Sequence, residues 1–162
     1  MIIGLLIMNS KLHKFPAKEF RKDFPIFNQK IYGKDLNFLD TAASSQKPQC
    51  VIDSINKCYS ENYSNIHRGV YYLSSKLTKQ YEDVREKVSK FLNAKNHKEI
   101  VFTKSATEAL NLLATCLCKN HLKDGDEILT TYLEHHANIV PWQIQTSGKN
   151  IKLIVADLND DT

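Results

Sequence analysis

The most constraining feature of the sequence is an alternation of secondary-structure patterns in its last third. Residues 99–103 are rich in β-forming side chains, and a helical apolar pattern follows from Thr107 to about His121. Residues 127–133 again have the composition of a strand, and a short helical pattern over 138–146 leads to a further strand over 151–158. Strand, helix, strand, helix, strand is typical of βαβ units. The sequence therefore predicts a parallel α/β sheet with right-handed crossovers.

Two longer helices are predicted upstream of this alternation. Apolar residues recur at helical spacing from Pro48 to Asn62 and, most clearly, from Ser74 to Asn93. A shorter helix over Pro16–Asp23 stops before Pro25, because proline disfavours the helical conformation in the residue that precedes it. The polar segment Asp40–Ser45 is predicted to be a turn.

The same patterns suggest how the chain is organised. We expect residues 1–35 to be an N-terminal segment with a short helix, and residues 36–162 to be an incomplete part of an α/β domain. The last strand ends just before Thr162 with no helix after it, whereas a parallel sheet needs covering helices and further strands. The sequence thus looks truncated.

The residues expected to point inward from the helix after Thr107 are Leu110, Leu113, Leu117 and either Cys116 or Ala114.

Charge and hydropathy limit the classes of partner. The chain carries 22 basic and 18 acidic side chains, a net charge of +4, and its densest basic stretch, Lys11–Asp23, also contains acids. This predicts a solvated amphipathic helix, and a nucleic-acid binder is the least favoured class because no stacking aromatics alternate with the charges. The apolar segment Met1–Met8 is too short to span a bilayer and lacks the basic region of a signal peptide. We expect a cytoplasmic protein, with Met8 as an alternative start.

The cysteines do not form a metal or redox motif. None of the four belongs to a C-x-x-C pair, and no Cys–His cluster has the spacing of zinc ligands. Most of them fall within helical patterns beside apolar residues. The sequence predicts buried free thiols in a reducing compartment at Cys50, Cys58, Cys116 and Cys118.

The first candidate site is the turn between the strand over 99–103 and the helix that follows. Ser105 and Glu108 have the spacing of a capping box, in which each side chain accepts a hydrogen bond from the backbone N–H of the other residue. The free N–H groups and the positive dipole end would suit a phosphate, and Thr107 offers a hydroxyl. The alternative is a well-capped helix with no ligand.

Two loops give further candidates. Glu134–Asn138 follows the predicted strand over 127–133, where ligands of open α/β sheets bind, and an imidazole there can stack on a planar ligand or carry a proton. Asn65–Gly69 places an arginine, which suits bidentate carboxylate or phosphate recognition, beside a glycine that permits a positive φ. The alternatives are loop histidines bonded to the backbone and a surface turn with a solvated Arg68.

The order of these motifs carries a family resemblance over nearly the whole chain from about Phe24. It resembles the group II (SufS type) cysteine desulfurases, which are pyridoxal 5'-phosphate (PLP) enzymes related to the class V aminotransferases. The most specific of the similar blocks is the last. The blocks are D-T-A-A-S-S-Q-K-P at 40–48, N-I-H-R-G at 65–69, E-I-V-F-T at 99–103 with A-T-E-A-L-N-L at 106–112, D-G-D-E-I at 124–128, and E-H-H-A-N-I-V-P-W-Q at 134–143.

The resemblance implies a fold, a reaction and roles for several residues. The fold would be the N-terminal part of a fold-type I PLP enzyme, with residues 36–162 in its PLP-binding domain. The enzyme would be a homodimer that converts L-cysteine to L-alanine and passes the sulfur, held as a persulfide, to an acceptor protein for iron–sulfur cluster assembly. Ala106 and Thr107 would hold the PLP phosphate and His135 would stack on its ring. The residues expected at the substrate site are Ala42, Ala43, His67 and Arg68.

The resemblance also implies what this chain lacks. The Schiff-base lysine, the persulfide-forming cysteine and the aspartate that pairs with the cofactor's ring nitrogen lie downstream in the family. We therefore assign no catalytic nucleophile and expect no activity from this chain alone. The alternatives are a related class V aminotransferase, a selenocysteine lyase, or a non-catalytic fragment that acts only through association. The segment Lys104–Ala106 departs from the Arg-Gly-Thr of many members, but it keeps a turn of small residues.

Overall fold

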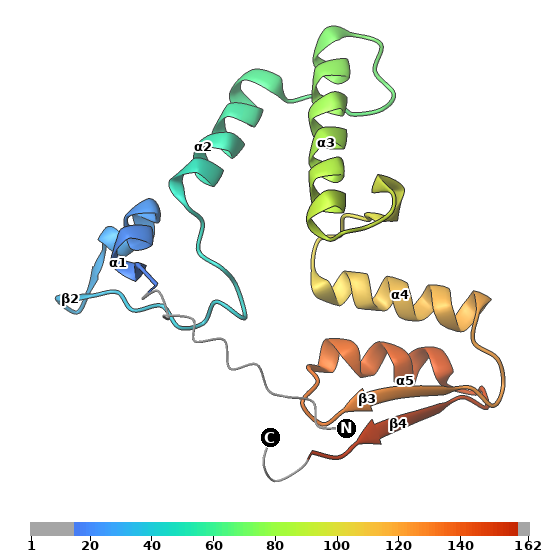
Figure 1. Ribbon diagram of the computed structural model, residues 1–162. Helices are drawn as coiled ribbons and strands as arrows, with labels where there is room; N and C mark the ends of the chain where they lie inside the picture. Colours follow the sequence, from blue (N-terminus) through green and yellow to red (C-terminus); the bar gives the residue numbers. More distant parts are fainter. Residues whose placement is uncertain (1–14, 159–162) are drawn as a thin grey trace, which may run out of the picture. The chain divides into compact units, whose positions relative to one another are not determined.

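The computed structural model describes residues 15–158, and the chain divides into two units between Lys87 and Val88. Each unit has its own set of elements (Figure 1). The first contains α1 (Ala17–Phe20), η1 (Arg21–Asp23), η2 (Pro25–Asn28), β1 (Lys30–Ile31), β2 (Lys34–Asp35), α2 (Gln49–Lys57), η3 (Cys58–Asn62) and most of α3 (Tyr72–Phe91). The second contains η4 (His97–Glu99), α4 (Ala106–Asn120), β3 (Glu127–Thr131), η5 (His136–Asn138), α5 (Val140–Thr146) and β4 (Lys152–Ala156).

The sheet of the second unit is parallel, as the alternation predicts. β3 pairs with β4 in a register that aligns Ile128 with Leu153 and Thr130 with Val155. The connection runs through η5 and α5, which ends before Gly148, a residue with φ of 76°. Glycine adopts this left-handed conformation without the penalty that a side chain would add. The predicted glycine stop of this helix is therefore confirmed.

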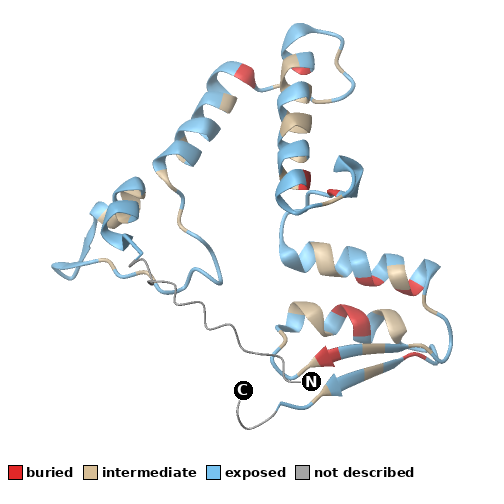
Figure 2. Ribbon diagram, in the orientation of Figure 1, coloured by how far each residue is buried: buried red, intermediate tan, exposed pale blue. Residues whose placement is uncertain are grey.

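The core of the second unit lies between the helices and one face of the sheet. Ala114 is fully buried, Cys118 is 3% exposed and Trp142 is 8% exposed. Leu117 and Leu122 pack against them together with Ile128 and Leu153 from the two strands. Figure 2 shows the buried positions of α4 on the side that faces α5. The helices thus cover one face of β3 and β4, whereas Leu129, on the other face, is 73% exposed.

The expected inward face of α4 is partly wrong. Ala114, the alternative position, is buried, and Leu117 packs against the core, but Leu113 is 47% exposed and Cys116 is also exposed. α4 is apolar around much of its circumference, so the helical period allows two faces. The contact with Trp142 selects the face centred on Ala114 and Cys118.

The prediction of buried thiols is likewise wrong for two cysteines. All four thiols are free, but Cys50 and Cys116 are exposed, Cys58 is half-buried, and Cys118 alone is buried. Cys50 is exposed because α2 buries none of its residues. An apolar pattern predicts which face of a helix can be buried, but burial needs a neighbouring element against that face.

The expected strand over 99–103 is absent. The short turn η4 occupies His97–Glu99, where the Asn96 side chain accepts a hydrogen bond from the Lys98 N–H at 2.9 Å. Residues 100–103 belong to neither two-stranded sheet of the described region. A strand is defined by pairing with a neighbour. In the described region β3 and β4 pair with each other and neither pairs with residues 100–103. A composition rich in β-forming residues is therefore not enough to make this segment a strand.

The helices of the first unit agree with the sequence prediction, with one local change. α2 continues into the π-helical turn η3, which together span the helix expected over 48–62. α3 begins and ends two residues earlier than the helix expected over 74–93, and α1 with η1 occupies 17–23 of the helix expected over Pro16–Asp23. Residues 41–43 form the predicted turn, with the Asp40 carbonyl accepting from the Ala43 N–H at 3.2 Å.

A small hairpin between η2 and this turn was not predicted. β1 and β2 pair antiparallel through Tyr32 and Gly33, whose φ values are 53° and 76°. Two positive φ values are characteristic of a type I′ turn, and the glycine at Gly33 is the sequence signal for it. The predictions about Met1–Met8 and the start at Met8 lie outside the described residues, as do Lys11 and Lys14. Among residues 15–158 no helix is long and apolar enough to cross a membrane.

Candidate functional site

The N-terminus of α4 is capped as predicted. The Ser105 side chain accepts a hydrogen bond from the Glu108 N–H at 3.2 Å. The Glu108 carboxylate accepts one from a backbone N–H just before the helix. That N–H belongs to Lys104 rather than to Ser105, one residue earlier than in the usual capping box. The cap is therefore closed by Ser105 and Glu108, and neither group uses the N–H groups of Ala106 and Thr107.

Ala106 and Thr107 leave two donors at this helix end. Both residues lie in the first turn of a 15-residue helix, where backbone N–H groups have no intrahelical acceptor. Among residues 15–158, no hydrogen bond occupies either N–H group. Two aligned N–H groups at the positive end of a helix dipole suit an anionic oxygen. The negative charge of the Glu108 carboxylate opposes this attraction. That carboxylate, however, already accepts a hydrogen bond from the Lys104 N–H.

The loop after β3 is tied to the core of the second unit. The Trp142 Nε1–H donates to the Asn138 side-chain oxygen at 3.1 Å, and the Asn138 amide donates to the Glu134 carboxylate at 2.9 Å. The Asn138 N–H also donates to the His135 carbonyl at 2.8 Å. Because Trp142 is buried, this series of hydrogen bonds fixes the backbone that carries His135. Asn138 is a residue of the site that motif reasoning alone left without a role.

The His135 ring has a defined orientation. Its Nδ1 accepts a hydrogen bond from the Ala137 N–H at 3.1 Å. In the neutral ring the proton is then on Nε2, because Nδ1 is occupied as an acceptor. The His136 ring meets it edge to face, with the centroids 6.1 Å apart. Both histidines are exposed, and among the described residues no three His, Cys, Asp or Glu side chains form a metal-binding group.

The three predicted cofactor residues share one end of the second unit. Figure 1 shows α4 beginning at the end of this unit where β3 and β4 finish. The loop with His135 leaves β3 at that same end, and η5 contacts α4. Ligands of open α/β sheets bind outside the carboxyl ends of the strands, so the predicted cofactor residues lie at the end of the sheet where a ligand is expected. The end of the unit offers two backbone donors, the Thr107 hydroxyl and an exposed imidazole.

The loop with His67 and Arg68 is held against α3 in the first unit. The His67 N–H donates to the Thr78 hydroxyl at 2.9 Å, and the His67 Nε2 lies 3.6 Å from a Glu82 oxygen. The His67 ring also meets the Tyr81 ring edge to face, with centroids 5.8 Å apart. His67 adopts a left-handed backbone with φ of 69°. Arg68 is exposed and makes no ion pair among the described residues.

Gly69 has a different reason to be glycine from the one expected. Its φ lies outside the left-handed region, which His67 occupies instead. A Cβ on Gly69 would stand 2.3 Å from the Ser74 Oγ and 2.4 Å from the Ser74 Cβ. The glycine is therefore needed for the close approach of the loop to α3. The prediction of a glycine-permitted positive φ at this position is wrong.

The remaining predicted substrate residues, Ala42 and Ala43, lie in the turn after Asp40 and are both exposed. They belong to the first unit with His67 and Arg68, whereas Ala106, Thr107 and His135 belong to the second. The structure thus groups the predicted cofactor residues in one unit and the predicted substrate residues in the other. Sequence reasoning did not identify Thr78 and Glu82. Their signal was polar side chains four residues apart within an otherwise amphipathic helix.

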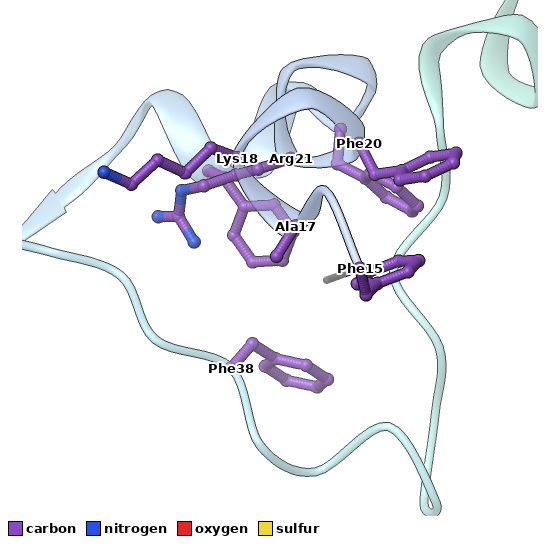
Figure 3. Close-up of a pocket in the computed structure, with 8 residues that line it drawn as sticks. Phe15, Ala17, Lys18, Phe20, Arg21 and Phe38 are labelled. Atoms are coloured by element: carbon purple, nitrogen blue, oxygen red, sulfur yellow. The ribbon is translucent and has the colours of Figure 1, made fainter. Parts of the chain in front are cut away.

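A separate hollow in the first unit contains none of these residues. Its volume is about 450 Å³, and its walls are mainly aromatic side chains of the N-terminal helical segment together with Phe38 (Figure 3). Phe15 and Phe20 stack at 5.1 Å, and the Arg21 guanidinium lies 4.4 Å from the Phe27 centroid. Arg21 also donates to the Leu36 carbonyl at 2.7 Å, which ties this segment to the following chain. Among residues 15–158, the walls carry no acid, histidine or thiol.

Comparison with known proteins identifies the family of this chain. The Aminotransferase class-V family matches residues 37–162. A probable cysteine desulfurase of Synechocystis is 48% identical over 143 residues, which are 87% of this chain and 34% of that protein. The cysteine desulfurase of Wigglesworthia glossinidia brevipalpis is 47% identical over 139 residues, which are 86% and 34% of the two chains.

Solved structures give the same result for the fold. The apo cysteine desulfurase of Thermococcus onnurineus is similar with a TM-score of 0.77 and 37% identity, over 88% of this chain and 34% of that one. The S-sulfonic acid form of the Escherichia coli cysteine desulfurase CsdA has a TM-score of 0.71 and 36% identity, over 90% and 35%. The chain therefore spans about a third of the length of the relatives it matches. The expected fold class, part of a fold-type I PLP enzyme, is confirmed, and the chain belongs to the class V aminotransferase family.

Proposed function

We propose that this chain is part of a PLP-dependent cysteine desulfurase of the group II type. The reaction takes L-cysteine and an enzyme thiol to L-alanine and an enzyme persulfide, so the sulfur leaves the substrate and no atom is left over. The observation that carries the proposal is the identity of 48% with a probable cysteine desulfurase over 87% of the chain. We further propose a cytoplasmic homodimer that passes the sulfur to an acceptor protein for iron–sulfur cluster assembly.

The residues at the end of the second unit fit a PLP molecule. Ala106 and Thr107 would hold its phosphate through two backbone N–H groups, because the capping bonds of Ser105 and Glu108 leave those donors available. The Thr107 hydroxyl would add a third donor. Bound PLP would act as the electron sink of the reaction. The His135 ring, oriented by its bond from the Ala137 N–H, would lie against the planar ring of the cofactor.

The first unit would supply the substrate contacts. Arg68 carries a planar guanidinium that matches the two oxygens of an amino-acid carboxylate, and it is exposed. Ala42 and Ala43 would line the same site with small side chains that leave space for L-cysteine. This chain contains no residue to which we assign the nucleophile. We therefore propose that residues 1–162 alone do not turn over L-cysteine.

A pair of adjacent histidines makes the first test specific. In the intact protein that contains this segment, loaded with PLP, His135→Ala should lower kcat/KM for L-cysteine about tenfold through the lost ring contact. His136→Ala is the matched control and should stay within about twofold, because its ring makes no proposed cofactor contact. Alanine and persulfide sulfur would both be quantified. Equal effects of the two substitutions would contradict the role of His135.

The phosphate contact has its own test. Thr107→Val should weaken PLP binding about fivefold, the effect of one lost hydrogen bond. Thr115→Val is the control, since Thr115 lies on the same helix and its hydroxyl donates to the Asn111 carbonyl. The products separate the desulfurase from the other classes. Alanine without persulfide sulfur, or turnover of L-selenocysteine in place of L-cysteine, would replace the proposal by another class V enzyme.

A further inference from the structure

One stripe of α3 faces the loop that carries Arg68. Ser74, Thr78 and Glu82 are spaced by four residues, which places them above one another on a helix. Each contacts the loop at a different point. Ser74 lies under Gly69, Thr78 accepts from the His67 N–H, and the Glu82 carboxylate lies beside the His67 ring.

Each of these contacts restricts a different movement of the loop. Ser74 is fully buried and leaves no room for a Cβ on Gly69, which fixes the closest approach of the loop to the helix. The Thr78 hydroxyl donates to the Ser74 carbonyl at 2.7 Å, so it is oriented to accept from the loop. The contact at Thr78 holds the backbone of His67, which is in the left-handed region at φ of 69°. A non-glycine residue stays in that conformation only when its surroundings hold it there.

The His67 side chain is engaged by the helix and Arg68 is not. The His67 Nε2 lies 3.6 Å from Glu82 Oε1, and the other oxygen of Glu82 accepts from the Arg85 Nε at 3.1 Å. The Arg85 guanidinium in turn lies 5.1 Å from the centroid of the Tyr81 ring, which also forms the T-shaped pair with the His67 ring. Next to this network, the Arg68 guanidinium is exposed. The two neighbours in the H-R-G motif thus differ in their availability for a ligand.

We infer that Thr78 and Glu82 are positioning residues that hold His67 as a fixed support of the loop, so that Arg68 alone presents the carboxylate-binding group. This rests on the proposed function, because it assigns the substrate contact of that site to Arg68. His67 acts through the loop conformation and does not touch the substrate. Of the two residues of this motif expected at the substrate site, only Arg68 would then contact the substrate.

The test uses the intact PLP-loaded protein. Thr78→Val keeps the shape of the side chain and removes the acceptor for the His67 N–H. It should raise KM for L-cysteine about fivefold and change kcat by less than about twofold, since the loss of one hydrogen bond loosens a binding group only. Thr78→Ser restores the hydroxyl and should return KM to the original value. Thr115→Val is the control for removing a helical threonine hydroxyl that contacts no loop.

Glu82 is tested in the same way. Glu82→Gln keeps the size and removes the charge beside His67, and should also raise KM with little change in kcat. Asp83→Asn is its control, because among the described residues Asp83 forms an ion pair with Lys79 alone. Arg68→Lys should raise KM more than either, since lysine lacks the planar fork of arginine. A His67 variant that lowers kcat more than it raises KM would overturn the assignment of His67 as a support.

Amide hydrogen exchange separates failure of this inference from failure of the proposed function. Thr78→Val should accelerate exchange of the His67 N–H about fivefold, because its hydrogen bond is lost, while the α4 amides stay unchanged. Unchanged exchange at His67 would overturn the holding role of Thr78. Faster exchange with an unchanged KM would overturn the link from the loop to the substrate. An unmodified protein that does not desulfurate L-cysteine would overturn the proposed function and the role of Arg68, while the exchange result still decides whether the loop is held.

Discussion

The two units differ in the chemistry of what they bury. Among the described residues, the buried apolar side chains all belong to the second unit. They are Ile100, Ala114, Cys118, Pro141, Trp142 and Ile151. In the described part of the first unit, the buried residues are Asn62 and Ser74, which are both polar. In the second unit apolar burial holds the elements together. In the first, hydrogen bonds and one close contact hold a loop on a helix. A fold held by an apolar core should lose stability on core truncation, whereas the loop should respond to changes at single polar contacts.

Truncation of the core tryptophan should have the largest effect. Trp142→Ala removes a side chain that is 8% exposed and its bond to Asn138, and should cost about 3–5 kcal/mol of unfolding free energy. Tyr59→Ala in the first unit, where the ring is 69% exposed, should cost less than about 0.5 kcal/mol. Urea denaturation followed by circular dichroism measures both. Equal costs would remove the contrast between the units.

The close contact in the first unit predicts the next largest effect. Gly69→Ala would place a Cβ 2.4 Å from the Ser74 Cβ and should cost about 1–3 kcal/mol, because backbone or helix must shift. Combining it with Ser74→Gly should cost less than the sum of the two single changes. A double-mutant cycle in urea provides the measurement. Additive costs would show that the two residues do not touch.

The cap of α4 has a smaller expected effect. Ser105→Ala removes the acceptor of the Glu108 N–H and should cost about 1 kcal/mol. Ser105→Asp keeps an acceptor and should recover most of that loss. α2 has no side-chain cap, since Pro48 precedes it. The stability of the alanine and aspartate variants, compared by urea denaturation, tests the cap. An alanine variant as stable as the original would contradict it.

The smallest effect is expected at a buried hydroxyl. Thr130 Oγ1 has no hydrogen-bond partner in the described region, so Thr130→Val should leave stability unchanged or raise it by up to about 1 kcal/mol. Thr131→Val is the matched control, because the Thr131 hydroxyl accepts from the Leu133 N–H at 3.3 Å. Thermal unfolding of the two variants would compare them. A clear loss of stability at Thr130 would indicate that its hydroxyl has a partner.

Much of the local structure could be predicted because it depends on neighbours in sequence. The cap at Ser105, the stop at Gly148 and the parallel pairing of β3 with β4 follow from short-range patterns and the βαβ rule. The strand over 99–103 could not be predicted reliably, since strand formation depends on a partner elsewhere in the chain. The inward face of α4 failed for the same reason: several apolar faces were available, and Trp142 selected one.

In the candidate site, too, some features depend on local sequence patterns and others on contacts that form only in the folded chain. The sequence by itself predicts which residues would bind the cofactor and the substrate, because the order of the motifs assigns Ala106, Thr107, His135 and Arg68 to those roles. It also determined the fold class, because hydrophobic periodicity and turn residues act locally. Tertiary structure alone decided that Gly69 is needed for its approach to Ser74 and that His67 rests on Thr78 and Glu82. The physical reason is that these are contacts between residues that lie well apart in the sequence, which exist only once the loop has folded back onto α3.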